Sequence, residues 1–174
     1  MGASRMGWMQ PKWRQAKVSL TESRYGLSRS ILRIFLVLSE LKTLHGELRK
    51  VIAELAAETA KAEPDEAMLP VIRLKLTRVS SRRKALIECS ISPLMHDIQP
   101  EDARRIEGLR RIAADKAVES SAHIARWTMR TIRADWPGYR RASAEMRAQM
   151  LRRISEEADI LYPLLEAKAA PKAA

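Results

Sequence analysis

The amino-acid sequence predicts an all-α protein: an antiparallel up-down bundle of four long helices behind an N-terminal extension. Three observations carry this prediction. Good helix formers such as Ala, Leu, Arg, Glu, Lys and Met dominate, while the 174 residues include only 6 glycines. β-branched residues never run in alternating stretches, so a sheet has little from which to form. Apolar residues instead recur at steps of three and four, the spacing of one helix face.

Proline, glycine and N-capping residues divide the chain into its expected elements. Ser28 or Ser30 can cap the first helix, and Pro100 followed by two acids is a strong start for the third. Trp136-Pro137-Gly138 is expected to break the chain between the third and fourth helices. The helices are predicted over residues 28–60, 71–90, 100–134 and 139–165. The domains are then a basic and aromatic extension over 1–27, the bundle over 28–166 and a flexible tail over 167–174.

Each predicted helix carries an apolar seam, and three of the four seams contain one charged or imidazole residue. The first seam consists of Ile31, Ile34, Leu38, Leu41, His45, Leu48, Ile52 and Leu55, and the third of Ile106, Leu109, Ala113, Ala117, Ser120, Ile124 and Trp127. His45 interrupts the first seam, Arg83 the second and Glu157 the fourth, while the weaker third seam has His123 beside it. An imidazole or a charge inside a bundle is costly unless it is paired. All three interruptions lie near mid-helix, so we expect them to share one level of the bundle and form a polar centre.

Each interruption also has a simpler interpretation. His45 would be a core histidine with satisfied hydrogen bonds. Arg83 would extend its aliphatic stem to the surface. Glu157 would lie at the seam edge and pair with Arg153 one turn earlier on the same helix.

Several motifs resemble the bacterial hemerythrin-like (HHE cation-binding) domain family over roughly residues 28–166. In the fourth helix, Glu157 stands four residues before the run Leu161-Tyr162-Pro163-Leu164. The second helix has a similar frame, in which Arg83 is followed by Ile91-Ser92-Pro93-Leu94. The resemblance implies a four-helix bundle around a non-haem di-iron site, and binding or sensing of oxygen, peroxide, nitric oxide or iron.

The resemblance implies few iron ligands when it is carried over residue by residue. His45 matches the first-helix ligand, Glu157 matches the last-helix carboxylate, and His123 is the candidate on the third helix. Other ligand positions of the family hold residues that do not bind iron: Arg83, Ile87 and Arg153.

The chemistry of these replacements argues against a di-iron centre. Such a centre needs about five or six nitrogen and oxygen ligands, and arginine is always protonated and offers no lone pair. We therefore predict a polar core in place of the metal, with Arg83 and Arg153 paired to Glu157 and His45 hydrogen-bonded to the group. A metal site of His45, His123 and Glu157 remains the alternative, with non-haem iron as its cofactor.

From this polar core and the resemblance we predict a bacterial protein that is not an enzyme and needs no cofactor. It would act in signalling or regulation by binding a protein partner or a small ligand. One alternative is a non-haem iron domain that binds or senses oxygen or nitric oxide. Another, based on the net charge of +11, is a basic module that binds nucleic acid or an anionic membrane.

Cysteine content and hydropathy predict a cytoplasmic protein. The single cysteine, Cys89, excludes an internal disulfide, and we expect it to be a small buried hydrophobe beside the second seam. No apolar run approaches the roughly 20 residues of a membrane span, and we find no signal peptide. In the N-terminal extension, Trp8 and Trp13 lie among basic residues. They are expected to pack onto the bundle, with an anionic membrane surface as the alternative.

Overall fold

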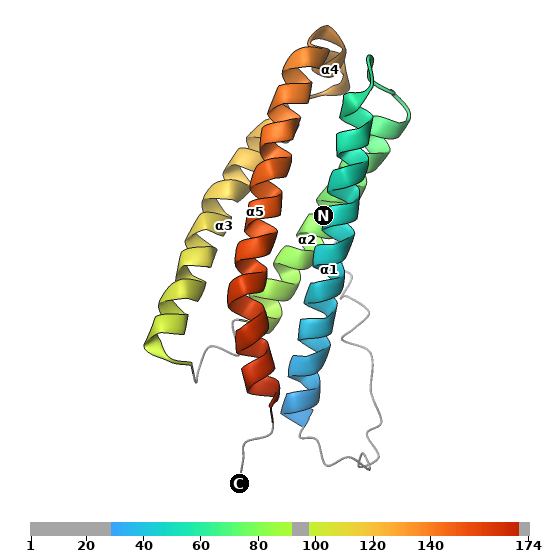
Figure 1. Cartoon of the computed structure of the whole chain (residues 1–174). Coiled ribbons are helices and arrows are strands. Elements are labelled where there is room, and N and C mark those ends of the chain that lie inside the picture. The colour runs from blue at the N-terminus through green and yellow to red at the C-terminus, as the bar shows by residue number, and fades with distance from the viewer. Residues whose placement is uncertain (1–28, 92–97, 171–174) are drawn as a thin grey trace, which may run out of the picture.

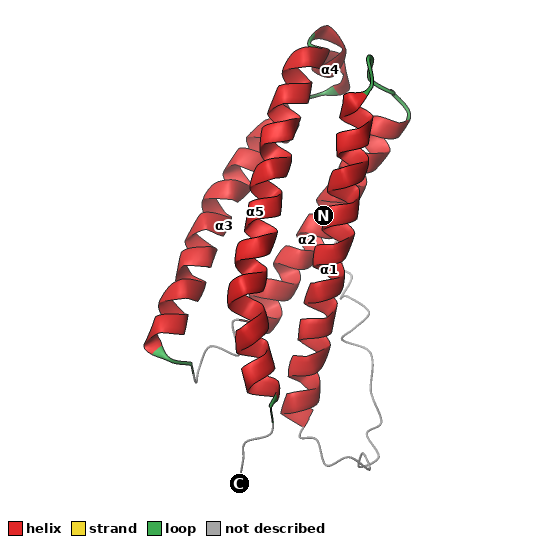
Figure 2. Ribbon diagram, viewed as in Figure 1, coloured by secondary structure: helices red, strands yellow, loops and turns green. Residues whose placement is uncertain are grey.

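The computed structural model describes residues 29–91 and 98–170, and helices contain nearly all of them. The elements are α1 (Arg29–Ala60), α2 (Met68–Leu86), the π-helical turn η2 (Ile87–Ile91), α3 (Pro100–Arg126), α4 (Met129–Ala134) and α5 (Trp136–Ala169). The four longest helices lie side by side, and short α4 joins α3 to α5 at one end (Figure 1). The described ranges contain no strand (Figure 2), which confirms the predicted all-α class.

The membrane prediction is tested over the same residues. None of their helices combines the length and the apolar composition that crossing a bilayer requires. The predicted N-terminal extension lies outside the described residues, with Trp8 and Trp13 in it.

Helix α1 is central to the core because it packs against both α2 and α5. Its buried side chains recur at steps of three and four, and between Ile34 and Leu55 they include every residue of the predicted first seam. One part of this core joins three helices through a single cluster: Leu44, Leu48 and Ile52 of α1, Val79 of α2 and Ile154 of α5. Fully burying each such side chain contributes about 1.5–3 kcal/mol, so this cluster stabilises the bundle near its middle.

Helix α3 is the least buried of the four long helices. It rests mainly on α5, and Ile106 is its one buried residue. Ile124, which the third seam was predicted to bury, is 48% exposed. Small residues such as Ala113, Ala117 and Ser120 occupy the same seam and remove little apolar area from water. Consequently α3 does not close tightly against α2.

The start of α2 differs from the prediction because of an aspartate cap. The helix begins at Met68, not at residue 71, since Asp65 Oδ1 accepts hydrogen bonds from the backbone N–H groups of Ala67 (3.1 Å) and Met68 (2.9 Å). Pro70 then falls in the first turn, where the fixed φ of proline is compatible with the start of a helix. At its other end α2 continues into η2.

The predicted long third helix is wrong, because a break divides it. Helix α3 ends at Arg126, and Thr128 starts α4 by accepting a hydrogen bond from the N–H of Thr131 (3.3 Å). Trp136-Pro137-Gly138 begins α5 and does not lie in the break. Asp135 caps this helix through the N–H of Gly138 (2.8 Å), and a Cβ on Gly138 would collide with the Asp135 carboxylate. The helix then continues to Ala169, past the predicted end at 165 and into the expected tail.

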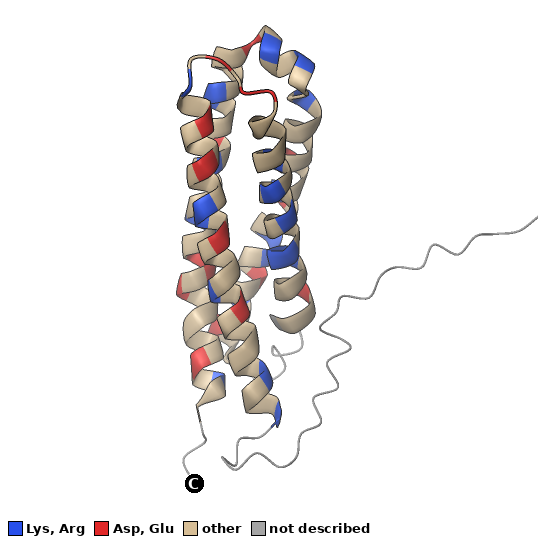
Figure 3. Ribbon diagram, turned by 90° about the vertical axis from the view of Figure 1, so that its right-hand side faces the viewer, with Lys and Arg blue, Asp and Glu red and all other residues tan. Residues whose placement is uncertain are grey.

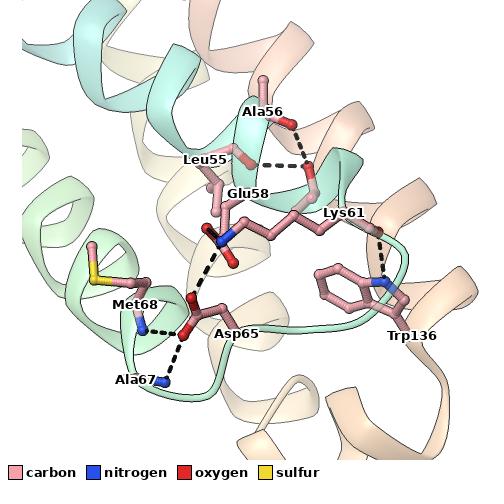
Figure 4. A network of polar contacts seen from close by, with 9 residues as sticks. Leu55, Ala56, Glu58, Lys61, Asp65, Ala67, Met68 and Trp136 are labelled. Atoms are coloured by element: carbon pink, nitrogen blue, oxygen red, sulfur yellow. Dashed lines mark hydrogen bonds and ion pairs between the residues drawn. The ribbon is translucent and has the colours of Figure 1, made fainter.

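A polar network holds the α1–α2 turn against the first turn of α5 (Figure 4). The Lys61 ammonium contacts the buried carboxylate of Glu58 (2.7 Å) and the carboxylate of Asp65 (3.2 Å). The Lys61 carbonyl accepts a hydrogen bond from the Trp136 indole (3.2 Å). This network fixes one end of the bundle by tying three elements together.

Candidate functional site: a buried ion-pair cluster

The buried histidine of α1 makes two hydrogen bonds to α5. His45 is fully buried, with Nε2 3.1 Å from Glu157 Oε2 and Nδ1 2.8 Å from the Tyr162 hydroxyl. An ionised carboxylate only accepts hydrogen bonds, so Nε2 carries the proton and donates to Glu157. Nδ1 and the Tyr162 hydroxyl form the second hydrogen bond. Both ring nitrogens are thus satisfied within the protein.

Glu157 is the centre of the cluster, because two arginines also contact its carboxylate. Arg83 Nη1 of α2 lies 3.3 Å from Oε2, and Arg153 Nε donates to Oε1 at 2.9 Å from one turn earlier on α5. Burial alone would raise the pKa of Glu157. The hydrogen bond from His45 and the charges of Arg83 and Arg153 outweigh burial and hold the pKa below its usual value. The carboxylate is therefore ionised at neutral pH.

Arg83 is buried and does not reach the surface. It is only 6% exposed, so the interpretation of Arg83 as a surface-reaching side chain is wrong. Burial lowers its pKa, the charge of Glu157 raises it, and the charge of Arg153 lowers it again. An arginine starts from so high a pKa that it stays charged. Two guanidinium groups thus share a single carboxylate in this cluster.

The structure brings together the four residues of the predicted polar core, His45, Arg83, Arg153 and Glu157, from three helices. Sequence reasoning missed one participant, Tyr162. It stands five residues after Glu157 in the Leu-Tyr-Pro run, and its position there was the available signal.

The predicted metal set of His45, His123 and Glu157 does not assemble. The ring of His123 lies 6.1 Å from that of Tyr139, at the start of α5. Tyr139 and Glu157 are about 27 Å apart along α5 at about 1.5 Å of rise per residue. Burial and the charges of Arg73 and Arg126 lower the pKa of His123. Within residues 29–91 and 98–170, no three His, Cys, Asp or Glu side chains are grouped closely enough to hold a metal.

Cys89 is exposed, so the prediction of a buried cysteine is wrong. It lies in η2, where the π-helical turn changes the phase of the helix. A position that a regular helix would place beside the seam therefore faces solvent.

A cavity of about 490 Å³ adjoins the cluster between α2, α3 and α5. Arg83 and Arg153 form part of its wall. The Arg83 Nε atom is buried and has no hydrogen-bond partner in the protein. The cluster thus has one side packed in the core and one side on this cavity.

Comparisons with known protein families, with curated proteins and with solved structures found no match for this chain.

Proposed function

We propose that the chain is a hemerythrin-like, antiparallel four-helix bundle whose metal centre is replaced by an ion-pair cluster, and that it binds a small ligand. The four long helices and the Leu-Tyr-Pro run after Glu157 support this assignment. In this proposal the protein is not an enzyme. It would regulate another process through the ligand or partner that it binds.

One observation carries the metal-free part of the proposal: Arg83 and Arg153 both pair with Glu157, the carboxylate that would otherwise bind iron. The residues present do not fit a di-iron centre. Within the described residues, no third His, Cys, Asp or Glu joins His45 and Glu157 in a group that could hold a metal, and these two already bind each other. Two guanidinium cations beside them oppose a further cation, and arginine supplies no lone pair.

The cluster acts as a structural tie between α1, α2 and α5. Removing one partner of a buried ion pair leaves an uncompensated charge, which costs about 3–5 kcal/mol. The cluster therefore keeps these three helices in register, and α3 contributes no residue to it. The cavity lies against α3, and it favours a small ligand over the protein partner as the bound species.

Incubation of the full chain with ferrous iron, followed by desalting and elemental analysis, tests the proposal. We expect no stoichiometric iron and no absorption of an oxo-bridged centre in the near ultraviolet. About two irons per chain would contradict the proposal, provided that the matched His45→Gln protein loses them. That variant separates iron at the cluster from iron held by surface carboxylates.

A further inference from the structure

The cavity between α2, α3 and α5 has the size of a small-molecule site. Its volume of about 490 Å³ falls within the range of roughly 300–1,000 Å³ that is typical for ligand pockets. It exists because α3 packs on α5 and presents small side chains toward α2, among them Ala113, Ala117 and Ser120. The small side chains of α3 therefore leave this space open.

The charge of the cavity wall is strongly positive. In addition to Arg83 and Arg153, the wall contains five cationic residues and a single acidic one, Glu156. The five are Arg73, Lys84, Lys116, Arg147 and Arg152. Lys84 contacts Glu88 of η2, and Lys116 contacts Glu119 of α3. Figure 3 shows basic residues without acidic ones along α2, which lines the cavity, whereas acidic and basic residues alternate along α1.

Two of these cations have neutral partners in place of carboxylates. Arg147 donates to the Ser143 hydroxyl (2.7 Å), and the Arg73 guanidinium lies over the Tyr139 ring, 5.7 Å from its centre. Neither forms an ion pair with any residue in the described part of the chain. Partial burial lowers the pKa of Arg147, the direction expected for a cation without a compensating anion.

Three buried polar atoms on the same wall have no hydrogen-bond partner in the protein. They are Ser80 Oγ, Arg83 Nε and Gln149 Oε1. Ser80 lies one turn before Arg83 on α2, and Gln149 lies one turn before Arg153 on α5, so all three lie near the cluster. Buried polar groups in proteins are nearly always satisfied. Two of these atoms can donate, which suits a ligand with acceptor oxygens.

Apolar side chains complete the wall. Leu76, Ile112, Met146 and Met150 line the cavity between the polar groups, and methionine adapts readily to ligands of different shape. We propose that this cavity binds a small organic anion, in which a carboxylate or phosphate group is joined to a short apolar chain. The assignment rests on the proposed function, because it names the ligand class of the same bundle.

Calorimetric titration of the full chain with three probes of equal chain length tests the charge requirement. Octanoate and octyl phosphate carry the two candidate head groups, whereas octanol has none. We expect at least one of the two anions to bind about tenfold or more tightly than octanol. Equal binding of octanol, or no binding of either anion at millimolar concentration, would overturn the proposal.

A pair of arginine variants locates the binding. Arg147→Met removes one cation from the cavity wall but keeps most of the apolar part of the side chain. Arg140→Met makes the same change at an exposed position of α5 outside the cavity wall. We expect the first variant to weaken octanoate binding about tenfold and the second to leave it unchanged. If Arg147→Met does not fold, Arg73→Met takes its place.

Equal affinity in both variants would place the anion elsewhere and refute the assignment. Failure here is distinguishable from failure of the proposed function. If the chain binds neither the anions nor iron, only the proposed ligand class is refuted. If it binds stoichiometric iron at the cluster, the proposal of a metal-free bundle is refuted.

Discussion

Replacement of Glu157 by glutamine should strongly destabilise the bundle. The change keeps the shape of the side chain but removes the one negative charge between Arg83 and Arg153. At 3.3 Å and 2.9 Å, with an effective dielectric constant of about 20, each guanidinium attracts the carboxylate by about 5–6 kcal/mol. Most of this attraction offsets the desolvation of the three charged groups in the native protein.

In the variant the two arginines remain buried, so their desolvation persists without the attraction. We therefore expect the free energy of unfolding to fall by about 3–5 kcal/mol. Urea denaturation at neutral pH, followed by far-ultraviolet circular dichroism, measures this free energy of unfolding. The matched control is Glu156→Gln, which removes an exposed charge at the preceding position and should change stability by about 0.5 kcal/mol or less. A loss below about 1 kcal/mol for Glu157→Gln would refute the reasoning.

Three further changes probe the fold around the cluster. Because the folded pKa of Glu157 lies below its ordinary value of 4.5, its stabilisation is complete above that pH and declines as pH falls toward the folded pKa. As pH falls below 4.5, the urea midpoint of the native chain should therefore drop more than the midpoint of Glu157→Gln. An equal dependence of the two midpoints on pH would contradict this prediction. Tyr162→Phe removes the hydroxyl at His45 Nδ1 and should cost about 1 kcal/mol in urea, while no loss would show that the bond contributes nothing. Gly138→Ala displaces the Asp135 cap and should also cost about 1 kcal/mol in thermal unfolding, whereas a gain would show that alanine fits beside the cap.

Helix content follows from the sequence because it depends on apolar periodicity, which is local. The seam of α1 between Ile34 and Leu55 shows this, since its predicted residues are all buried. Helix ends were predicted less well because single side chains decide them. Asp65 starts α2 early, and Asp135 turns Trp136-Pro137-Gly138 from a break into a helix start. A capping bond requires a particular backbone turn, which the sequence pattern does not specify.

The cluster could be predicted because a charge inside an apolar seam must find a partner. His45, Arg83 and Glu157 stood out for this reason. Arg153 followed from its spacing of one turn before Glu157 and from the resemblance. The error over His123 has a different cause. Periodicity gives the face of a helix but neither the level of each residue relative to other helices nor how closely a helix packs. The cavity beside α3 was missed on the same ground, since it depends on the spacing between helices.

A double-mutant cycle between Arg83 and Glu157 tests most directly whether a buried ion-pair cluster holds the centre of this bundle. The cycle compares the unfolding free energies of the native chain, Arg83→Met, Glu157→Gln and the double variant. We expect a coupling of about 2 kcal/mol, because each single change leaves a charge without its partner and the double change does not. Additive effects within about 0.5 kcal/mol would mean that the two residues do not stabilise each other, and would contradict the proposed role of the cluster.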